Sequence, residues 1–161
     1  MSGLRNAAVV IASTRAAAGI YEDECAPIIA AWLMGQGFAV QEAVVVPDGP
    51  AVGEAIGVAL ERRPSVLLTS GGTGLSPDDT TPEQTEPYLS RRLPGIMEAI
   101  RRAGAETVPT AALSRGLAGT AGSTFVINLP GSPGGVRDGL AVLEPVLHHI
   151  CTQLEGKNDH G

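Results

Sequence analysis

Short apolar runs alternate with longer helix-like segments along this chain, and this alternation restricts the fold more than any other feature. The apolar runs occupy about residues 7–12, 38–46, 65–69, 107–112 and 123–129. The helix-like segments fall at about 22–36, 51–63, 82–89, 94–104 and 134–155. Strands separated by helices predict a mostly parallel sheet with helices on both faces. We therefore expect a single doubly wound, three-layer α/β domain.

The least regular apolar run lies at 107–112. It contains Pro109, which lacks the N–H that a central strand needs, so we expect an edge strand there. The domain is expected to span 1–156, because no linker, internal repeat or low-complexity segment interrupts it. The polar residues at 157–161 are expected to form a flexible tail.

Composition and charge exclude several classes of protein. A chain of 161 residues buries a sufficient core without disulfides, so Cys25 and Cys151, far apart and in no metal-binding spacing, are expected to be buried free thiols. The net charge of −6, without a basic cluster, argues against nucleic-acid binding. No apolar stretch approaches membrane-spanning length, so we expect a soluble cytoplasmic protein. Charged residues make up only 17%, which favours an oligomer that buries part of the surface.

A glycine-rich loop follows the apolar run at 65–69. Its residues are Ser70, Gly71, Gly72, Thr73 and Gly74. Open α/β sheets bind ligands at the carboxyl ends of their strands, and the three glycines tolerate positive φ, so successive N–H groups can converge on one anion. The loop has neither the lysine of a Walker loop nor the spacing of a dinucleotide-binding loop. We therefore expect a phosphate site whose charge is neutralised by a cation.

Two carboxylates and a helix start come next. Asp78 and Asp79 precede Thr81, Pro82 and Gln84, which suit the N-cap, the first and the third helical positions. A carboxylate pair beside an anion site fits a divalent cation held between the acids and phosphate oxygens. The same acids also fit solvated loop residues or caps of the following helix, so both interpretations stay open.

Four polar loops each follow an expected strand, at 13–19, 47–50, 70–81 and 130–135. Because neighbouring parallel strands end at a common crevice, these loops are expected to form one site. Pro130, Gly131 and Ser132 precede a long helix, whose start can bind an anion, although a simple chain reversal fits them equally well. On its neighbours alone, Asp48 in Val-Pro-Asp-Gly-Pro fits a turn or a helix cap better than a ligand.

A serine hydrolase is disfavoured. Gly131 is adjacent to Ser132, whereas a nucleophile elbow needs a spacer between them, and no histidine is placed beside this turn. His148 and His149 fall late in the final helix, where surface roles are more common than catalysis, and are assigned no function.

Five motifs occur together in one order. They are Thr69-Ser-Gly-Gly-Thr-Gly74, Asp79-x-Thr-Pro82, Leu93-Pro-Gly-Ile-Met-Glu98, Leu113-Ser-Arg115 and Asn128-Leu-Pro-Gly-Ser-Pro133. With them the chain resembles the molybdenum-cofactor biosynthesis family of MogA/MoaB type, to which the gephyrin G domain is related, from Val9 to about His149. The first loop departs from the family pattern: it reads Ser13-Thr14-Arg15, then Cys25-Ala26, where the family usually has Ser-Asp-Arg or Ser-Asp-Thr and then Ser-Gly.

The resemblance implies a doubly wound fold assembled as a trimer or a hexamer, and Mg²⁺- and ATP-dependent adenylylation of molybdopterin. It carries catalytic roles over to Asp48 and Asp79, which would also hold Mg²⁺, and leaves Asp78 as a spare. Substrate binding then falls to residues 70–74 and to Pro130, Gly131 and Ser132. Ser13 in the first loop and Glu98, reaching a neighbouring subunit's crevice, are further candidates. A molybdenum-insertion protein is an expected partner.

In the implied reaction the terminal phosphate of molybdopterin attacks the α-phosphorus of ATP and pyrophosphate leaves. Such chemistry needs positioning and charge neutralisation more than a protein nucleophile. The alternative function is a non-catalytic molybdopterin carrier or scaffold subunit that keeps the pocket without turnover. Pyrophosphate release discriminates between the two.

Overall fold

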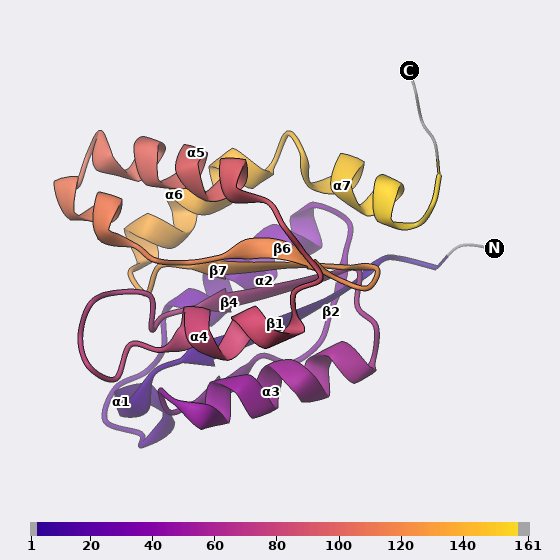
Figure 1. Cartoon of the computed structure of the whole chain (residues 1–161). Helices are drawn as coiled ribbons and strands as arrows, with labels where there is room; N and C mark the ends of the chain where they lie inside the picture. Colours follow the sequence, from indigo (N-terminus) through magenta and orange to yellow (C-terminus); the bar gives the residue numbers. More distant parts are fainter. Residues whose placement is uncertain (1–2, 158–161) are drawn as a thin grey trace.

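The computed structural model describes residues 3–157 and folds them into an α/β domain with helices on both faces of a seven-stranded sheet (Figure 1). The mostly parallel, three-layer architecture expected from the sequence is confirmed. The tail expected at 157–161 lies outside the described residues, except for Lys157. Among the described residues, no helix combines the length and the apolar character needed to cross a membrane.

Three parallel strands form the middle of the sheet: β1 (Asn6–Ala12), β4 (Val66–Ser70) and β7 (Thr124–Leu129). Two short strands, β2 (Ala39–Val40) and β3 (Val44–Val46), pair in parallel with β1. At the other edge, β6 (Ala118–Ala121) and β5 (Arg91–Arg92) run antiparallel to their neighbours. The chain moves from β1 to β2 and β3 on one side, then returns to β4 on the other side. The ligand-binding crevice of such sheets lies at this reversal.

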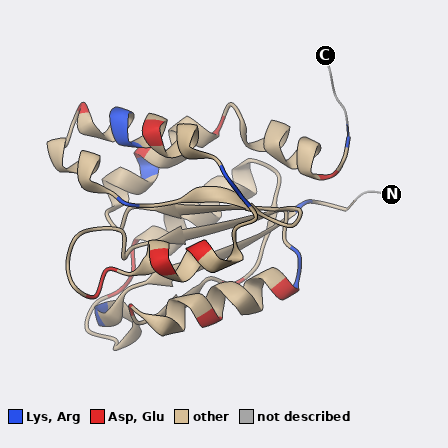
Figure 2. Ribbon diagram, viewed as in Figure 1, with Lys and Arg blue, Asp and Glu red and all other residues tan. Residues whose placement is uncertain are grey.

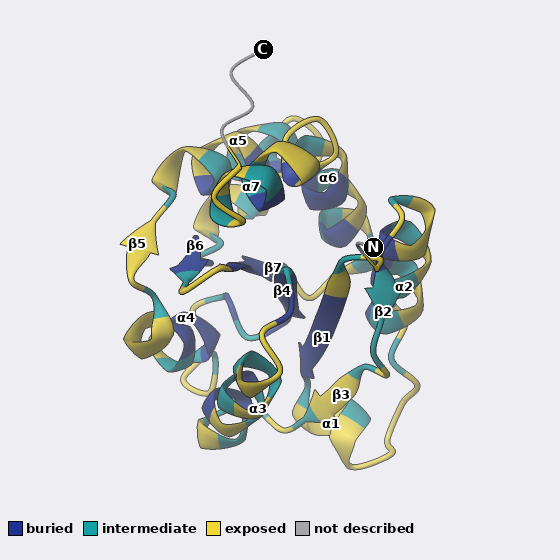
Figure 3. Ribbon diagram, turned by 90° about the vertical axis from the view of Figure 1, so that its right-hand side faces the viewer, coloured by how far each residue is buried: buried dark blue, intermediate teal, exposed yellow. Residues whose placement is uncertain are grey.

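The helices divide between the two faces of the sheet (Figure 3). One face carries α2 (Cys25–Gly35), α5 (Pro94–Ala105), α6 (Pro133–Leu143) and α7 (Leu147–Leu154); the other carries α3 (Pro50–Glu61) and α4 (Thr81–Thr85), with the 3₁₀ helix η1 (Glu86–Tyr88) after α4. Alternate residues of β1 enter the two cores, Val9 the first and Val10 the second. Both expected buried free thiols are confirmed: Cys25 in α2 and Cys151 in α7.

The expected edge strand at 107–112 is wrong. Residues Pro109–Leu113 form the 3₁₀ helix η2, which packs on α5 and is not part of the sheet. Pro109 fixes φ for the start of a helical turn, and the segment has no apolar alternation to hold it in a strand. The edge is instead made by β5 and β6. Their residues are small or charged, and a Cβ at Gly119 would collide with the carbonyl oxygen of Arg91, so this pairing needs a glycine.

Other boundaries differ in detail. The run at 38–46 is interrupted and forms β2 and β3 separately. The helix expected at 134–155 ends at Leu143 and resumes at Leu147, because Pro145 cannot continue it. Ser13 caps the four-residue α1 (Thr14–Ala17), which the sequence did not predict.

Candidate functional site

Two neighbouring cavities lie at the carboxyl ends of β1, β4 and β7. The smaller, about 250 Å³, is lined mainly by polar residues and the larger, about 820 Å³, by a mixture of polar and apolar ones. Both are lined by Gly72, Asp79 and Gly131. The three residues therefore form a common wall, which we call the shared wall. Loops that follow β1, β3, β4 and β7 all reach the smaller cavity, so the expected convergence of four loops is confirmed.

Gly71 sits where the ends of three strands meet. Its φ is 96°, its N–H donates to Leu129 O at 3.1 Å, and an added Cβ would collide with Ala12 O. A Cβ at Gly131 would lie 3.3 Å from Gly71 Cα. The expectation that the Gly71 N–H faces a ligand is wrong, because it holds β4 to β7. The residue instead allows the backbones to approach closely.

The next N–H groups are free to bind a ligand. Within residues 3–157, those of Gly72, Thr73 and Gly74 donate to no protein acceptor. Gly72 has a φ of 69°, and Ser70 fixes the loop to the opposite turn by donating from Oγ to Pro130 O at 2.7 Å. The loop thus presents three successive N–H groups near the shared wall, as an anion nest does.

The turn at Pro130 leads directly into a helix. Ser132 is the N-cap of α6, and its Oγ accepts a hydrogen bond from Gly135 N at 3.1 Å. Pro130, Gly131 and Ser132 all line the larger cavity, so the turn does more than reverse the chain. Eleven-residue α6 therefore directs its positive end toward this site.

Asp48 is held by the first loop. Its Oδ2 accepts hydrogen bonds from Thr14 Oγ1 at 3.0 Å and Thr14 N at 3.3 Å, while its own N–H donates to Thr14 Oγ1 at 3.0 Å. Its Oδ1 lies 3.0 Å from the position of an added Cβ on Gly72. The carboxylate is therefore fixed by one oxygen and presents the other toward the glycine loop.

Asp79 occupies the shared wall. Its Oδ2 accepts from Ser76 N at 3.1 Å and lies 2.8 Å from the position of an added Cβ on Gly74. No donor among residues 3–157 reaches its Oδ1. Asp78 lines only the smaller cavity and is exposed. The two adjacent acids thus have different surroundings.

The donor set at this site fits a small oxygen-binding cation. The Thr81 hydroxyl is buried without a hydrogen-bond partner, as is that of Thr80, and an added Cβ on Gly72 would collide with Thr81 Oγ1. Thr81 Oγ1 and Asp48 Oδ1 therefore border the same place above Gly72. Asp79 supplies a third oxygen at the shared wall, and hydroxyl and carboxylate oxygens suit Mg²⁺. Among residues 3–157 there is no group of three or more His, Cys, Asp or Glu suited to a metal.

The start of α4 differs by one residue from expectation. Thr80 is the N-cap residue and makes no side-chain capping bond, whereas Thr81 begins the helix and donates its N–H to Gly72 O at 3.0 Å. The helix start is thus tied to the glycine loop through the backbone, which leaves the Thr81 hydroxyl without a capping role.

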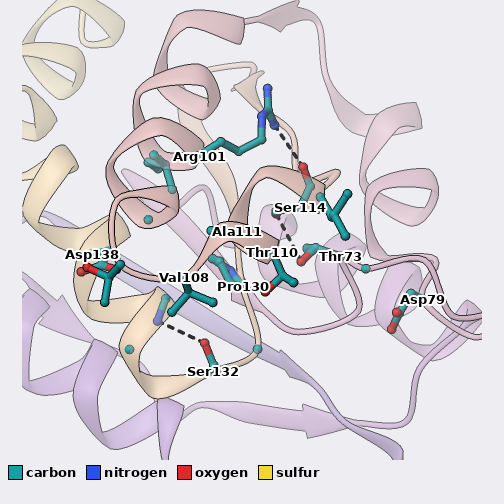
Figure 4. A pocket seen from close by; sticks show the side chains of 18 of the residues that line it. Thr73, Asp79, Arg101, Val108, Thr110, Ala111, Ser114, Pro130, Ser132 and Asp138 are labelled. Atoms are coloured by element: carbon teal, nitrogen blue, oxygen red, sulfur yellow. Dashed lines mark hydrogen bonds between the residues drawn. The ribbon is translucent and has the colours of Figure 1, made fainter.

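The far wall of the larger cavity comes from α5 and η2 (Figure 4). Asp79 lies at one end of the cavity and Asp138 at the other, with Val108 near Asp138. Arg101 donates to Ser114 O at 3.3 Å. Sequence reasoning missed this wall because it assigned 107–112 to the sheet and gave Arg101 no role.

Cationic side chains border both cavities. Arg15, which lies over the Tyr21 ring at 5.7 Å, lines the smaller cavity, and Arg101 and Arg137 line the larger. Acidic residues occur along α3 and α4, while arginines of α5 lie on the other side of the sheet (Figure 2). Carboxylates outnumber the arginine in the smaller cavity, where Asp23, Asp48, Asp78 and Asp79 accompany Arg15. An anionic ligand there would therefore need a bound cation or backbone N–H groups to offset its charge.

The buried thiol of Cys25 stabilises the turn that contributes Gly131 to the site. Burial raises the pKa of its thiol, which stays protonated and donates to Gly131 O at 3.4 Å. Asp23 has a structural role at the start of α2. Its carboxylate accepts hydrogen bonds from Cys25 N at 3.2 Å and from Ala26 N at 2.7 Å.

The structure brings most of the expected site residues together. Those that line the two cavities are Ser13, Asp48, Ser70, Gly71, Gly72, Thr73, Gly74, Asp79, Pro130, Gly131 and Ser132. Glu98 lies on an exposed part of α5 and lines neither. Thr14 and Arg101 also line the cavities, and the buried Thr81 lies beside Gly72 without lining either cavity. The orphaned Thr81 hydroxyl has no sequence signal, because a threonine before a proline reads as a cap.

Comparisons with known proteins agree with this architecture. A family model described as "Probable molybdopterin binding domain" matches residues 8–149. The solved structure of the molybdopterin biosynthesis Mog protein from Mycobacterium ulcerans is similar, with a TM-score of 0.90 and 57% identity over 93% of this chain and 99% of that one. A molybdopterin adenylyltransferase of Helicobacter pylori strain 26695 is 34% identical over 150 residues, covering 91% of this chain and 85% of that protein.

Two longer proteins also match. The molybdenum cofactor biosynthesis bifunctional protein of Synechococcus elongatus is 43% identical over 157 residues, which is 96% of this chain and 49% of that protein. Gephyrin of Dictyostelium discoideum is 33% identical over 160 residues, 92% of this chain and 22% of gephyrin. The chain thus spans half or less of the length of these two relatives. It belongs to the molybdopterin-binding domain family of MogA/MoaB type, a family of molybdenum cofactor biosynthesis to which gephyrin is related.

Proposed function

We propose that the chain catalyses Mg²⁺- and ATP-dependent adenylylation of molybdopterin. The observation that carries the proposal is the shared wall: a small polar cavity and a large mixed one meet at Gly72, Asp79 and Gly131. Two substrates bound in the two cavities would thus present their phosphates to the same groups. Similarity to proteins named molybdopterin adenylyltransferase supports the same reaction.

The reaction transfers an adenylyl group between the two substrates. A terminal phosphate oxygen of molybdopterin forms a bond to the α-phosphorus of ATP, the bond from that phosphorus to the bridging oxygen breaks, and pyrophosphate leaves. The substrate is the nucleophile, so the protein contributes orientation and charge stabilisation.

The backbone supplies the fixed part of that stabilisation. The free N–H groups of Gly72, Thr73 and Gly74 would bind phosphate oxygens beside the shared wall. Gly131 and Ser132 would add the N-terminal end of α6. Ser70 and Gly71 hold these two loops at a constant separation, and the hydroxyl of Ser13 would contact the ligand in the smaller cavity.

Asp48, Asp79 and Thr81 are the residues that would hold Mg²⁺, which when bound neutralises phosphate charge and orients the reacting oxygens. Asp48 and Asp79 each keep one carboxylate oxygen free for this purpose. Mg²⁺ commonly takes one or two carboxylates and completes its shell with water and substrate phosphate, so this small set is sufficient.

The larger cavity suits an extended ligand with a flat ring. Its volume of about 820 Å³ lies in the range of cofactor sites, and Val108, Ile100 and Leu113 provide apolar surface. Arg101 and Arg137 would attract the anionic portions of the substrates.

Pyrophosphate release tests the proposal. We expect release only when molybdopterin, ATP and Mg²⁺ are all present, together with formation of adenylyl-molybdopterin. The rival function, a non-catalytic carrier or scaffold, would bind molybdopterin without consuming ATP. A stoichiometric complex with molybdopterin and no pyrophosphate release would reject catalysis.

We further propose that the protein forms a trimer or a hexamer, in which Glu98 of one subunit approaches a neighbour's crevice. We also propose that a molybdenum-insertion protein is the partner that receives the product.

We place the reaction in the cytoplasm. The buried free thiols are compatible with that reducing compartment.

A further inference from the structure

Arg115 lies next to the glycine loop but outside both cavities. It follows η2 and precedes β6, and its backbone N–H donates to Thr73 O at 2.9 Å. It is absent from the lining of either cavity, so its side chain does not face the space proposed for the substrates. Any effect on the reaction must therefore pass through the residues that it contacts.

The guanidinium of Arg115 joins the two ends of the loop at 74–79. Its Nε donates to Gly74 O at 2.9 Å, and its Nη2 donates to Asp79 O at 2.7 Å. Between these carbonyls the chain is exposed at 75–78. The loop has little packing of its own, because its internal bonds are Asp79 N to Ser76 O at 2.9 Å and Ser76 N to Asp79 Oδ2 at 3.1 Å.

The same guanidinium also pairs with α4. Its Nη1 lies 2.7 Å from Glu83 Oε2, and its Nη2 lies 3.3 Å from Glu83 Oε1. This pairing lowers the pKa of Glu83 and raises that of Arg115, so both groups are charged at neutral pH. The planar fork of arginine satisfies these three partners at once. A lysine ammonium lacks this rigid fork and would leave part of the arrangement unmade.

We propose that Arg115 is a positioning residue of the adenylylation reaction: by closing the loop at 74–79 it holds the Asp79 carboxylate at the shared wall. This inference rests on the proposed function. Asp79 reaches the reacting phosphates, whereas Arg115 acts only through the main-chain carbonyls of Gly74 and Asp79 and through Glu83.

The fold is expected to survive loss of this side chain. Helix α4 has a separate anchor in the core, where Asn128 Nδ2 donates to Thr85 Oγ1 at 3.0 Å and to Thr69 Oγ1 at 2.9 Å. Thr85 Oγ1 in turn donates to Thr81 O at 2.7 Å. Removing the guanidinium thus frees the loop while α4 stays on the sheet.

The test compares Arg115→Ala and Arg115→Lys with Arg92→Ala. Arg92 is a matched control, because it pairs with Glu86 at 2.7 Å, the same distance as the Arg115 pair, but contacts no residue of the loop. Two readouts are needed: amide hydrogen exchange at Ser76 and Asp79, and the separate kcat and KM of pyrophosphate release.

In Arg115→Ala we expect exchange at Ser76 and Asp79 to accelerate about tenfold or more, because the loop opens locally. We expect kcat to fall about 10- to 100-fold while KM for molybdopterin changes less than about threefold, because the carboxylate is misplaced but the ligand cavities remain. Arg115→Lys should recover little of either effect, and added methylguanidinium should restore part of kcat in Arg115→Ala. Arg92→Ala should match the parent protein.

Exchange that is unchanged in Arg115→Ala overturns the inference, as does a loss confined to KM. If Arg115→Ala fails to fold, Arg115→Lys supplies the same comparison. A parent protein that releases no pyrophosphate rejects adenylylation, whereas the exchange readout still decides whether Arg115 closes the loop. The two failures are therefore distinguishable.

Discussion

Asp78 and Asp79 are neighbours in sequence, yet their side chains occupy different environments. Asp79 is half-buried at the shared wall with one oxygen fixed by Ser76, whereas Asp78 is exposed and lines only the smaller cavity. The difference turns two adjacent carboxylates into a candidate catalytic residue and a matched control.

We predict that Asp79→Asn acts on the chemical step. The substitution keeps the shape and removes the charge that would hold Mg²⁺ against phosphate. It should cost about 3–4 kcal/mol of transition-state stabilisation, a rate loss of order 10²–10³. Molybdopterin affinity should change far less. Steady-state pyrophosphate release and a binding titration measure the two effects.

Asp78→Asn should retain near-normal turnover. The prediction fails if Asp78→Asn is inactive and Asp79→Asn active, or if both variants keep full activity at saturating Mg²⁺.

Gly72 is the second residue whose substitution has a predictable effect. Its φ of 69° disfavours any side chain, and an added Cβ would collide with Thr81 Oγ1 and crowd Asp48 Oδ1. We predict that Gly72→Val abolishes molybdopterin binding, because the added side chain would obstruct the glycine loop. Because Thr81 is buried, the same collision should also lower the free energy of unfolding by about 1–3 kcal/mol. Molybdopterin titration and thermal unfolding check both parts.

Gly95→Ala is the matched control, since nothing lies within 4 Å of an added Cβ there and φ is not positive. Retained molybdopterin affinity in folded Gly72→Val would show that the loop is only structural.

At the scale of elements, the docking of α7 depends on charge. Arg5 donates to Glu155 Oε2 from Nε and to Oε1 from Nη2, both at 2.9 Å, and its Nη1 lies 2.7 Å from His148 Nδ1. His148 in turn stacks on Phe38 and its Nε2 lies 2.7 Å from Gln36 O. One cluster thus joins α7 to the start of β1 and the end of α2.

We predict that this cluster weakens in acid. The hydrogen bond from Arg5 lowers the pKa of Glu155. The contribution of this carboxylate to stability is therefore complete above the unfolded pKa of about 4.3 and disappears as pH falls through the lower folded value. Glu155→Gln should lower the free energy of unfolding by less than about 1 kcal/mol at pH 7, because the side chain is partly exposed. The difference should be smaller at pH 3 than at pH 7, as measured by thermal unfolding.

Exposed Glu61→Gln at the end of α3 provides the comparison, with no difference expected at either pH. If parent and Glu155→Gln differ equally in stability at both pH values, the charge of Glu155 does not stabilise the docking of α7.

Element type was predictable where packing and periodicity agree. Residues of β1, β4 and β7 are buried on both sides, so continuous apolar runs revealed them. The small residues of β6 carry no such signal, and its place follows from pairing with β7. Glycine and proline mark the loops at 70–74 and 130–132, so their place at the carboxyl ends of strands, where the cavities lie, was predictable. The wall at α5 and η2 was not, since a cavity depends on tertiary packing between distant segments.

At the scale of the whole molecule, the surface retains considerable apolar area. Val44, Val45 and Val58 are 47%, 36% and 58% exposed on β3 and α3. Charged residues make up only 17% of the chain, so few of them are available to make the rest of the surface polar. A surface of this kind favours association between subunits.

We predict that the protein is not a monomer, and most simply a trimer. Light scattering at micromolar concentration should give the mass of three chains, or of six in a hexamer. The mass of a single chain of 16.4 kDa would reject the assembly and with it the approach of Glu98 to a neighbouring site.

The close packing of backbones at Gly71 restricts which parts of the site can vary when the substrate preference changes. Because the backbones of three strand ends meet there, the floor of the site tolerates almost no variation without loss of the fold. The opposite wall is free of that constraint: Val108 and Leu113 are each 52% exposed and make no contribution to the sheet. Selection for a different ring system would thus act on 107–113 and leave the loops proposed to bind phosphate unchanged, which makes this segment the place to engineer altered substrate preference.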